Sequence, residues 1–417
     1  MNASNWFKFT AGIAALATIA TVVAPAAHAV PFSSGNLVVE QLTGTSGNAT
    51  PINILEYTKS GSSVQTIAFP SSGANQQTDS ASATSNGYIN TYNGYLSVPG
   101  QNLAAGTASA SSSNTKVNSL LGTSGTVVTR TLFPTNGTAS APYSPFSGNN
   151  YRSSIATSGS TFYGTGASSG SPNTGGAWYF DGSAFTQVSS TATGQPTNLR
   201  NVDIFNNQLY ATSGASTGIG IWAIGSGLPT TAGNASTLLF NSSITGTGSP
   251  YGFMMFSTGG QGAGVLDLAY IADDRPTTLG GGLQKWTLSG TTWSNSWSLF
   301  VSGTPTGSNT LQSGTATNFA GLRGLAGTYD SVLGAYSLYA TTTETSNNRL
   351  ISILDTGTAT PSTYTTLGQA GTNQVFRGVD LSPVAVPEPS TYAIAAMATL
   401  GMADLIRRRR RAGNLDG

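Results

Sequence analysis

The sequence of 417 residues contains no cysteine, a single histidine, and only 7% charged residues. The histidine, His28, lies in a segment that we expect to be removed. Without His or Cys, the mature chain has no zinc site of the usual ligand types, no haem or blue-copper ligation, and no Ser-His-Asp or Cys-His catalytic pair. We therefore expect no metal and no cofactor, and any catalysis would depend on carboxylates, Lys or Tyr.

Charge is also scarce in the part of the chain that we expect to persist. Between Val30 and Val386 there are ten Lys and Arg against twelve Asp and Glu, a net charge of −2. A nucleic-acid site needs several Lys or Arg on one face, so this balance excludes a nucleic-acid partner. The hydrophobic content of 38%, with 16 Tyr, 16 Phe and 6 Trp, is nevertheless enough to build a packed core.

The amino-terminal segment has the features of a signal peptide. Lys8 precedes an apolar run over residues 11–24, and Ala27, His28 and Ala29 fit the small-x-small pattern that signal peptidase cleaves. These features predict a signal peptide over residues 1–29, cut before Val30. A buried amino-terminal helix is the alternative, but the polar segment that follows offers it no helical partner.

Residues 384–417 form a second targeting segment, in which a proline-rich motif precedes an apolar stretch over residues 392–406 and a basic cluster. The motif consists of Val386, Pro387, Glu388, Pro389, Ser390 and Thr391, and the cluster consists of Arg407, Arg408, Arg409, Arg410 and Arg411. The prolines favour an extended backbone. As a helix, the apolar stretch rises only about 22 Å, which is short for a hydrocarbon core of about 30 Å. By the positive-inside rule, the arginines leave the body outside the cytoplasmic membrane.

This order of motif, apolar stretch and arginines resembles the PEP-CTERM sorting tail of Gram-negative bacteria. The resemblance implies cleavage by an exosortase at the cell envelope. The precursor would be anchored transiently by a transmembrane helix over residues 392–406, and the product would reach the cell surface or the extracellular space. Asp404 departs from the usually uncharged tail, although Arg407 lies three residues away near the interface.

Residues 30–383 have the pattern of an all-β body. No long stretch has the i, i+3, i+4 apolar spacing of a helix, whereas short apolar runs alternate with Gly, Ser, Asn and Thr. A phrase made of an apolar residue, Arg, a small residue and another apolar residue recurs around Arg152, Arg200, Arg323 and Arg377. A second phrase follows the first three of these and ends at Thr165, Thr212 and Thr341.

The spacing of these phrases predicts a β-propeller. Arg152 and Arg200 are 48 residues apart, and Arg323 and Arg377 are 54 apart. A period near 50 is typical of propeller blades with three or four short strands. We predict six blades, with seven as the alternative count, and we expect residues 374–381 to complete the blade begun by residues 36–69. A pair of β-sandwiches and a right-handed β-helix are the alternative folds.

Several phrases of the body also resemble those of a group of secreted bacterial proteins of propeller-like type. They are Gly35-Asn36-Leu37-Val38-Val39, Ser249-Pro250-Tyr251-Gly252-Phe253, Ile271-Ala272-Asp273-Asp274-Arg275, Leu322-Arg323-Gly324-Leu325 and Phe376-Arg377-Gly378-Val379. The group has no established activity, so this resemblance implies a fold and leaves the function open.

Four arginines are the first candidate binding residues. Because they occupy equivalent repeat positions, Arg152, Arg200, Arg323 and Arg377 would form an incomplete ring at one mouth of the central channel. Such a ring suits an anion such as a uronate or a sulfate group. In the structural alternative, each arginine caps backbone carbonyls or pairs with an aspartate of an adjoining blade. The aspartates at equivalent positions are Asp203, Asp267 and Asp380.

A pair of acids and a pair of tryptophans are further candidates. Asp273 and Asp274 could bind a hard cation or act as the acid and base of glycoside hydrolysis. Adjacent residues of a strand point to opposite faces, however, and a turn locked by Arg275 is the alternative. We expect Trp293 and Trp297 to be exposed and available to stack on sugar rings, with core packing as the alternative.

These features favour an exported, exosortase-processed protein of the cell surface or extracellular matrix that binds polysaccharide or another surface component without catalysis. A carboxylate-dependent glycosidase or lyase acting on matrix polysaccharide is one alternative, and a purely structural matrix component is another. The expected partners are signal peptidase and exosortase during maturation, the membrane for the precursor, and an exopolysaccharide.

Overall fold

The computed structural model describes residues 30–44, 46–135, 144–276, 280–302, 309–313 and 319–385. Within these ranges the regular elements are 27 β-strands and one short 3-10 helix, η1 (Ala110–Ser112), so the predicted all-β class is confirmed. No helix in this part of the chain is long and apolar enough to cross a membrane. The predicted signal peptide with Ala27 and Ala29, the sorting motif at 386–391, the helix at 392–406 and the arginines at 407–411 lie outside the described residues.

Four of the sheets are antiparallel and follow the order of the sequence. The first contains β9 (Tyr151–Ala156), β10 (Phe162–Gly166), β11 (Gly176–Phe180) and β12 (Phe185–Gln187). The second contains β13 (Leu199–Phe205), β14 (Gln208–Ser213), β15 (Gly220–Ile224) and β16 (Ser236–Asn241). The third contains β17 (Pro250–Phe256), β18 (Leu268–Asp273), β19 (Gly282–Ser289), β20 (Thr292–Ser302), β21 (Leu311–Gln312) and β22 (Phe319–Ala320). The fourth contains β23 (Leu322–Asp330), β24 (Ala335–Thr342), β25 (Arg349–Asp355) and β26 (Thr365–Gln369).

A nine-stranded sheet combines the beginning and the end of the described chain. One half pairs β27 (Gln374–Leu381) with β1 (Leu37–Thr43), β2 (Ala49–Tyr57) and β3 (Ser63–Ala68). The other half pairs β5 (Asn90–Tyr92), β6 (Tyr95–Gln101), β7 (Lys116–Leu121) and β8 (Val127–Leu132). The short strand β4 (Thr78–Ser80) joins the two halves, because it pairs with β2 and with β6. The expectation that residues 374–381 join the sheet of the first strands is confirmed by the pairing of β27 with β1.

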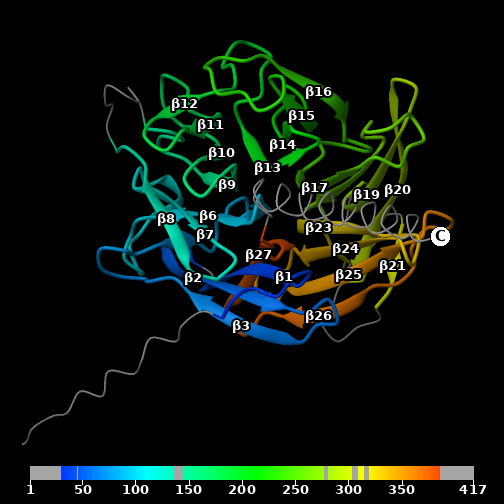
Figure 1. Ribbon diagram of the computed structural model, residues 1–417, viewed down its shortest axis with the longest axis horizontal. Coiled ribbons are helices and arrows are strands. Elements are labelled where there is room, and N and C mark those ends of the chain that lie inside the picture. The colour runs from blue at the N-terminus through cyan, green and yellow to red at the C-terminus, as the bar shows by residue number, and fades with distance from the viewer. Residues whose placement is uncertain are drawn as a thin grey trace, which may run out of the picture.

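The sheets are arranged around a common centre, so the body is propeller-like (Figure 1). The innermost strands are β5, β9, β13, β17, β23 and β27, and each contacts the next. The last of them, β27, in turn contacts β5. The innermost strands therefore surround a central axis without a gap.

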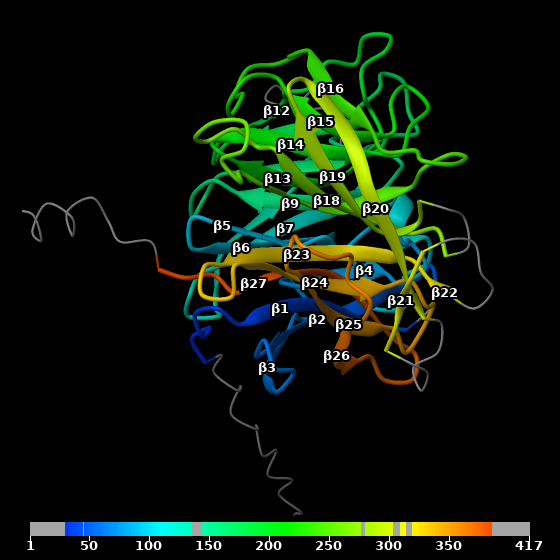
Figure 2. The same ribbon diagram turned by 90° about the vertical axis from the view of Figure 1, so that its right-hand side faces the viewer.

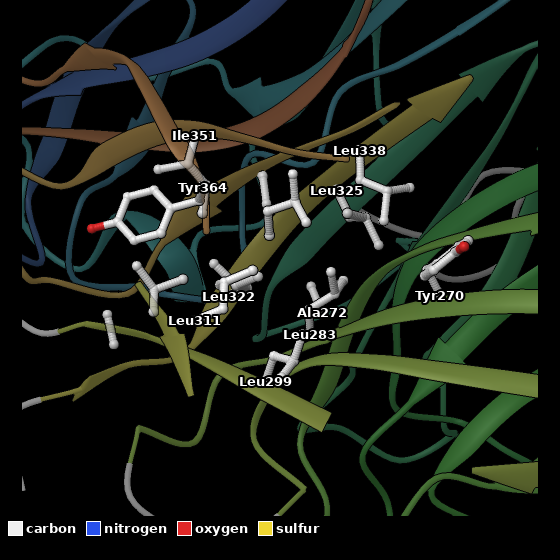
Figure 3. Close-up of a cluster of buried hydrophobic side chains, with 14 of the residues drawn as sticks. Tyr270, Ala272, Leu283, Leu299, Leu311, Leu322, Leu325, Leu338, Ile351 and Tyr364 are labelled. Atoms are coloured by element: carbon white, nitrogen blue, oxygen red, sulfur yellow. The ribbon is translucent and has the colours of Figure 1, made fainter. Parts of the chain in front are cut away.

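The apolar core is divided among the spaces between neighbouring sheets. Successive side chains of a strand point to opposite faces, so Leu338 and Ala340 of β24 pack against the third sheet while Tyr339 packs against β1 and β27. Figure 3 shows one such space, where Leu283 of β19 and Leu325 of β23 belong to one buried cluster. Burying a leucine fully is worth about 1.5–3 kcal/mol, and each sheet gains this on both faces.

The two ends of the described chain lie on one face of the molecule. In Figure 2 the dark blue beginning and the orange-red end both leave the ribbon on the left side. Ser34 and Gly35 from the beginning line the same cavity as Ser382 and Val384 from the end. This face, which we call the tail face, is where the innermost strands end.

Candidate functional site

Six side chains gather on the opposite face, at the end of the channel where the innermost strands begin. They are Tyr88, Arg152, Arg200, Tyr251, Arg323 and Arg377, and we call them the arginine–tyrosine ring. Arg152 lies near Arg200 and both tyrosines, and Arg377 lies near Arg323 and Tyr88. The rings of Tyr88 and Tyr251 lie 5.7 Å apart, although they come from opposite sides of the channel. The guanidinium carbons of Arg200 and Arg323 lie 4.1 and 6.0 Å from the centre of the Tyr251 ring. The structure thus brings the four sequence-predicted arginines together.

Local backbone irregularity aims these side chains into the channel. The antiparallel register of β9, β13, β17, β23 and β27 shifts at the ring residue in every case. Such β-bulges redirect a side chain and bend the strand. A glycine follows the ring residue in three of these strands, at Gly252, Gly324 and Gly378, which lets the backbone of the next unit approach closely.

The threonines of the second repeated phrase tie the sheets to the ring. The hydroxyl of Thr165 donates to the carbonyl of Arg200 at 2.8 Å, and that of Thr212 donates to the carbonyl of Tyr251 at 2.7 Å. Thr341 donates to the carbonyl of Arg377 in the same way, at 2.6 Å. Each threonine therefore holds the ring residue of a following sheet in position.

The arginines mostly use their terminal nitrogens on neighbouring backbone. Arg152 donates to the carbonyl of Leu199 at 3.0 Å, and Arg200 donates to the carbonyl of Pro250 at 2.9 Å. Arg377 donates to the carbonyl of Ala81. Arg323 forms an ion pair with Asp274 at 3.4 Å. Three of the four arginines thus donate to backbone carbonyls, as the structural alternative to an anion-binding ring predicted.

The ring nevertheless keeps unused donors and an excess of positive charge. The Nε atoms of Arg152, Arg323 and Arg377 are buried and have no hydrogen-bond partner among the described residues. Burial and the neighbouring guanidinium groups lower the pKa of Arg152 and of Arg377 to about 10, so both stay charged at neutral pH. A carboxylate or sulfate oxygen would satisfy such donors.

Two fully buried carboxyl groups lie behind Arg377. Neither oxygen of Glu40 has a hydrogen-bond partner in the described structure, and burial raises the pKa of this group well above its usual value, with a further contribution from Asp79. The pKa of Asp79 rises to about 6 because of burial, although Asn86 donates to it at 2.8 Å. Arg377 favours the charged form of both acids.

An arginine pairs with an aspartate of an adjoining sheet once in the described structure, in the ion pair of Arg323 with Asp274. The aspartates at equivalent repeat positions, Asp203, Asp267 and Asp380, lie elsewhere. Asp203 and Asp380 lie three residues beyond Arg200 and Arg377, a distance of about 10 Å along a strand, and line a cavity of about 540 Å³ at the tail face. Burial and mutual repulsion raise the pKa of Asp203, and burial raises that of Asp380 to about 7. Asp267 instead accepts hydrogen bonds from Thr258, at 2.6 and 2.7 Å.

These raised pKa values predict that acid stabilises the fold. Acids whose pKa is raised by folding contribute stability that is fully present below the unfolded pKa near 4 and is lost as the pH rises through the folded pKa. For Asp79 and Asp380 these folded values are about 6 and about 7. We therefore expect the free energy of unfolding, measured by urea titration, to fall between pH 5 and pH 7. Lys116, whose pKa burial lowers to about 7, acts in the opposite direction above that pH.

Replacement of single aspartates checks the origin of this pH dependence. Asp380→Asn should flatten the decline between pH 5 and pH 7. Asp181→Asn should leave it unchanged, because hydrogen bonds from Ala184 and Ser183 lower the pKa of the exposed Asp181. A free energy of unfolding that rises over this interval would contradict the assignment.

The paired acids Asp273 and Asp274 diverge. The side chain of Asp273 is fully buried, and Arg275 donates to both of its oxygens, at 2.8 and 3.0 Å. Asp274 points instead to Arg323 of the ring. The alternative interpretation, a turn held by Arg275, is therefore the one observed. Both carboxylate oxygens of Asp273 accept hydrogen bonds from Arg275.

The two tryptophans of β20 also separate. Trp293 stacks on Phe240 at 4.8 Å and packs against a core cluster between the second and third sheets. Trp297 packs toward the fourth sheet, beside Lys285, and lines a shallow cavity of about 280 Å³ with Thr358 and Thr360. Both are half-buried, so they do not form an exposed pair.

Sequence reasoning missed the two tyrosines of the ring and the acids behind it. Tyr251 was detectable, because Pro250-Tyr251-Gly252-Phe253 has the same apolar and small positions as Leu322-Arg323-Gly324-Leu325. Glu40 gave no local signal, since it meets Arg377 only through the pairing of β1 with β27.

The described body is thus an all-β, propeller-like domain with a basic channel mouth. The model of the PEP-CTERM protein-sorting motif matches residues 385–411. The chain therefore carries this sorting motif at its carboxyl end, as the sequence predicted. The motif indicates a protein that is exported and processed by an exosortase in a bacterium with a Gram-negative-type envelope, and that resides at the cell surface or outside the cell.

Other comparisons add no activity. No curated protein matches the chain. Among solved structures, a chain of a nidogen/laminin complex is similar with a TM-score of 0.47 and 11% identity, over 84% of this chain and 99% of that one. Putative 6-phosphogluconolactonases from Bacteroides fragilis and Bacteroides uniformis have TM-scores of 0.39 and 0.37 and 14% identity. Each covers 80% of this chain, with 82% and 83% of their own lengths.

Proposed function

We propose that this protein is a six-bladed, non-enzymatic propeller that binds an acidic polysaccharide of the cell surface or extracellular matrix at the arginine–tyrosine ring. Signal peptidase removes residues 1–29, which leaves a body over residues 30–383. The helix at 392–406 anchors the precursor in the membrane until exosortase cleaves the tail. The arginines at 407–411 stay on the cytoplasmic side.

Three features support the count of six blades. The nine-stranded sheet divides at β4 into two four-stranded halves. With the other four sheets, these halves give six units, each with one innermost strand. In the described chain, six apolar clusters lie between neighbouring units.

The observation that carries the binding proposal is the unbalanced charge of the ring. Four arginines from four sheets converge, and Asp274 is the carboxylate that forms an ion pair with one of them in the described structure. The buried Nε donors of three of them, Arg152, Arg323 and Arg377, have no partner in the described structure. This is a cost that an incoming anion would remove. Arg200 and Arg323 are the half-buried members, so they are the ones that a uronate carboxylate or a sulfate group can reach from solvent.

Binding to polysaccharides of different charge tests this proposal. We expect the purified body to bind polygalacturonate or alginate, and not neutral dextran, in isothermal titration calorimetry. Arg200→Gln and Arg323→Gln should each weaken binding about tenfold or more, because a charge-assisted hydrogen bond is worth about 1.5–3 kcal/mol. Thermal unfolding of each variant reports whether the fold is retained.

The matched control is Arg130→Gln, in which the arginine lies on the outer strand β8 and donates to Asn102 at 2.9 Å. Its binding should equal that of the parent protein, and raised salt should weaken binding of the parent. Equal binding of dextran, or full binding by the folded Arg200→Gln and Arg323→Gln variants, would refute the proposal.

Export and processing have their own test. Intact mass and terminal sequencing of the natively secreted protein should place the ends near Val30 and near Pro389. A secreted form that retains the arginines at 407–411 would rule out removal of the tail.

A further inference from the structure

The hairpin that joins β23 to β24 carries an exposed apolar tip. The side chains of Tyr329, Val332 and Leu333 are 51%, 93% and 62% exposed. The carboxylate of Asp330 accepts hydrogen bonds from the backbone N–H groups of Val332 and Leu333, at 2.9 and 3.1 Å. Because Asp330 fixes the turn in this way, the two aliphatic side chains are held outward in a defined geometry.

This tip lies on the tail face. Gly327 and Thr328 at the base of the hairpin line the same 540 Å³ cavity as Ser382 and Val384 at the end of the described chain. In Figure 2 the yellow hairpin loop and the orange-red chain end project on the same side. Val384 is itself 44% exposed, so the tail face presents a further apolar side chain close to the end of the described chain.

Chain length limits how far this face can lie from a membrane. Eight residue steps separate Val384 from Tyr392, where the apolar stretch begins. At about 3.3–3.6 Å per residue, the fully extended chain spans less than about 30 Å. Whenever the apolar stretch occupies a bilayer, the tail face is therefore held within this distance of the lipid surface.

The composition of the tip suits the interface of a bilayer. Aliphatic side chains gain free energy on leaving water, and tyrosine is favoured where lipid headgroups meet the hydrocarbon. The hairpin turns that follow β5, β9 and β13 on the same face are polar, with Asn93, Ser158 and Asn206. The tip of the β23–β24 hairpin thus differs from these three turns, and its Val332 and Leu333 are more exposed than Val265 in the loop after β17, which is 39% exposed.

We propose that the β23–β24 tip is a lipid-contacting element, in which Val332 and Leu333 enter the interfacial layer of the bilayer that holds the precursor. This inference rests on the proposed anchoring of the tail in the membrane. It adds a second contact that orients the body, with the arginine–tyrosine ring directed away from the lipid.

The absence of cysteine from the chain makes a direct test possible. Val332→Cys, in a chain of residues 30–417, is labelled with an environment-sensitive fluorophore and reconstituted into vesicles of phosphatidylethanolamine and phosphatidylglycerol. Thr193→Cys, exposed on the ring face between β12 and β13, is the matched control. We expect a blue shift and severalfold stronger quenching by spin-labelled lipid at position 332 than at position 193. Adding Leu333→Ser should reduce the quenching at 332.

The outcomes separate this inference from the anchoring proposal. Sedimentation with the vesicles, together with a label at 332 that is as water-exposed as the label at 193, would overturn the lipid contact alone. Failure of the chain to sediment with vesicles would overturn anchoring and, with it, the lipid contact. A blue shift at 332 without vesicles would assign the tip to contact between protein copies instead.

Discussion

Arg377→Met is expected to lower the free energy of unfolding by about 3–5 kcal/mol, the usual cost of removing one partner from a buried set of charges. Arg377 is fully buried, and it is the nearby cation that favours the charged form of Glu40 and of Asp79. Methionine is also unbranched near the backbone but is shorter, and it has no charge. The acids would then have to be buried charged without Arg377 or take up protons, and both cost stability at neutral pH.

Urea unfolding of Arg377→Met alone and combined with Glu40→Gln measures this effect. We expect part of the loss to disappear in the Glu40→Gln background, because a neutral amide does not need the guanidinium group. The loss should also be smaller at pH 5 than at pH 8, since the buried acids bind protons. An equal loss with and without Glu40→Gln would mean that Arg377 acts through packing and its bond to Ala81 instead of through charge.

Gly378→Ala is expected to destabilise the protein by about 3 kcal/mol, at the upper end of the usual cost of overpacking. A Cβ atom at this position would lie 2.6 Å from the carbonyl oxygen of Gly87 and 2.6 Å from the backbone nitrogen of Ile89. Both atoms belong to the backbone and cannot rotate away. The added methyl group would therefore push β27 away from β5, at the point where the last innermost strand meets the first.

Gly170→Ala is the matched control for this substitution. Its Cβ atom would meet only the hydroxyl oxygen of Ser147, at 4.0 Å. The variant should be as stable as the parent protein or slightly more stable, because alanine restricts the unfolded chain. Equal urea midpoints for the two alanine variants would show that the contact between β27 and β5 yields without cost.

The sequence predicted the class of fold and the position of the inner strands, because one physical requirement produces the repeated phrases. An innermost strand needs a bulged residue that faces the channel and a small residue beside its neighbour, so Arg323-Gly324 and Arg377-Gly378 repeat in the chain. The strand β5 escaped this pattern, since Tyr88 occupies the ring position there and Ile89 follows it.

Charge partners were harder to predict than strands. The repeat places Asp203 three residues after Arg200 and Asp380 three residues after Arg377. Along a strand this spacing is about 10 Å, so each aspartate lies too far from its arginine to form an ion pair. The actual neighbours of Arg377 are Glu40 and Asp79, which are distant in sequence. Glu40 and Asp79 come close to Arg377 only because β27 pairs with β1. No local sequence pattern predicts which residues that pairing brings together.

The pairing of β27 with β1 also sets the order in which this protein can fold. Residues Leu37 and Leu381 are partners in this sheet although they lie at opposite ends of the body. Contacts between such distant residues form late, because the loop that they close is long. If the chain crosses a membrane with its amino end first, one edge of β1 stays unpaired until β27, the final strand, has also crossed. The β27–β1 sheet can then be completed only after nearly the whole body has been translocated.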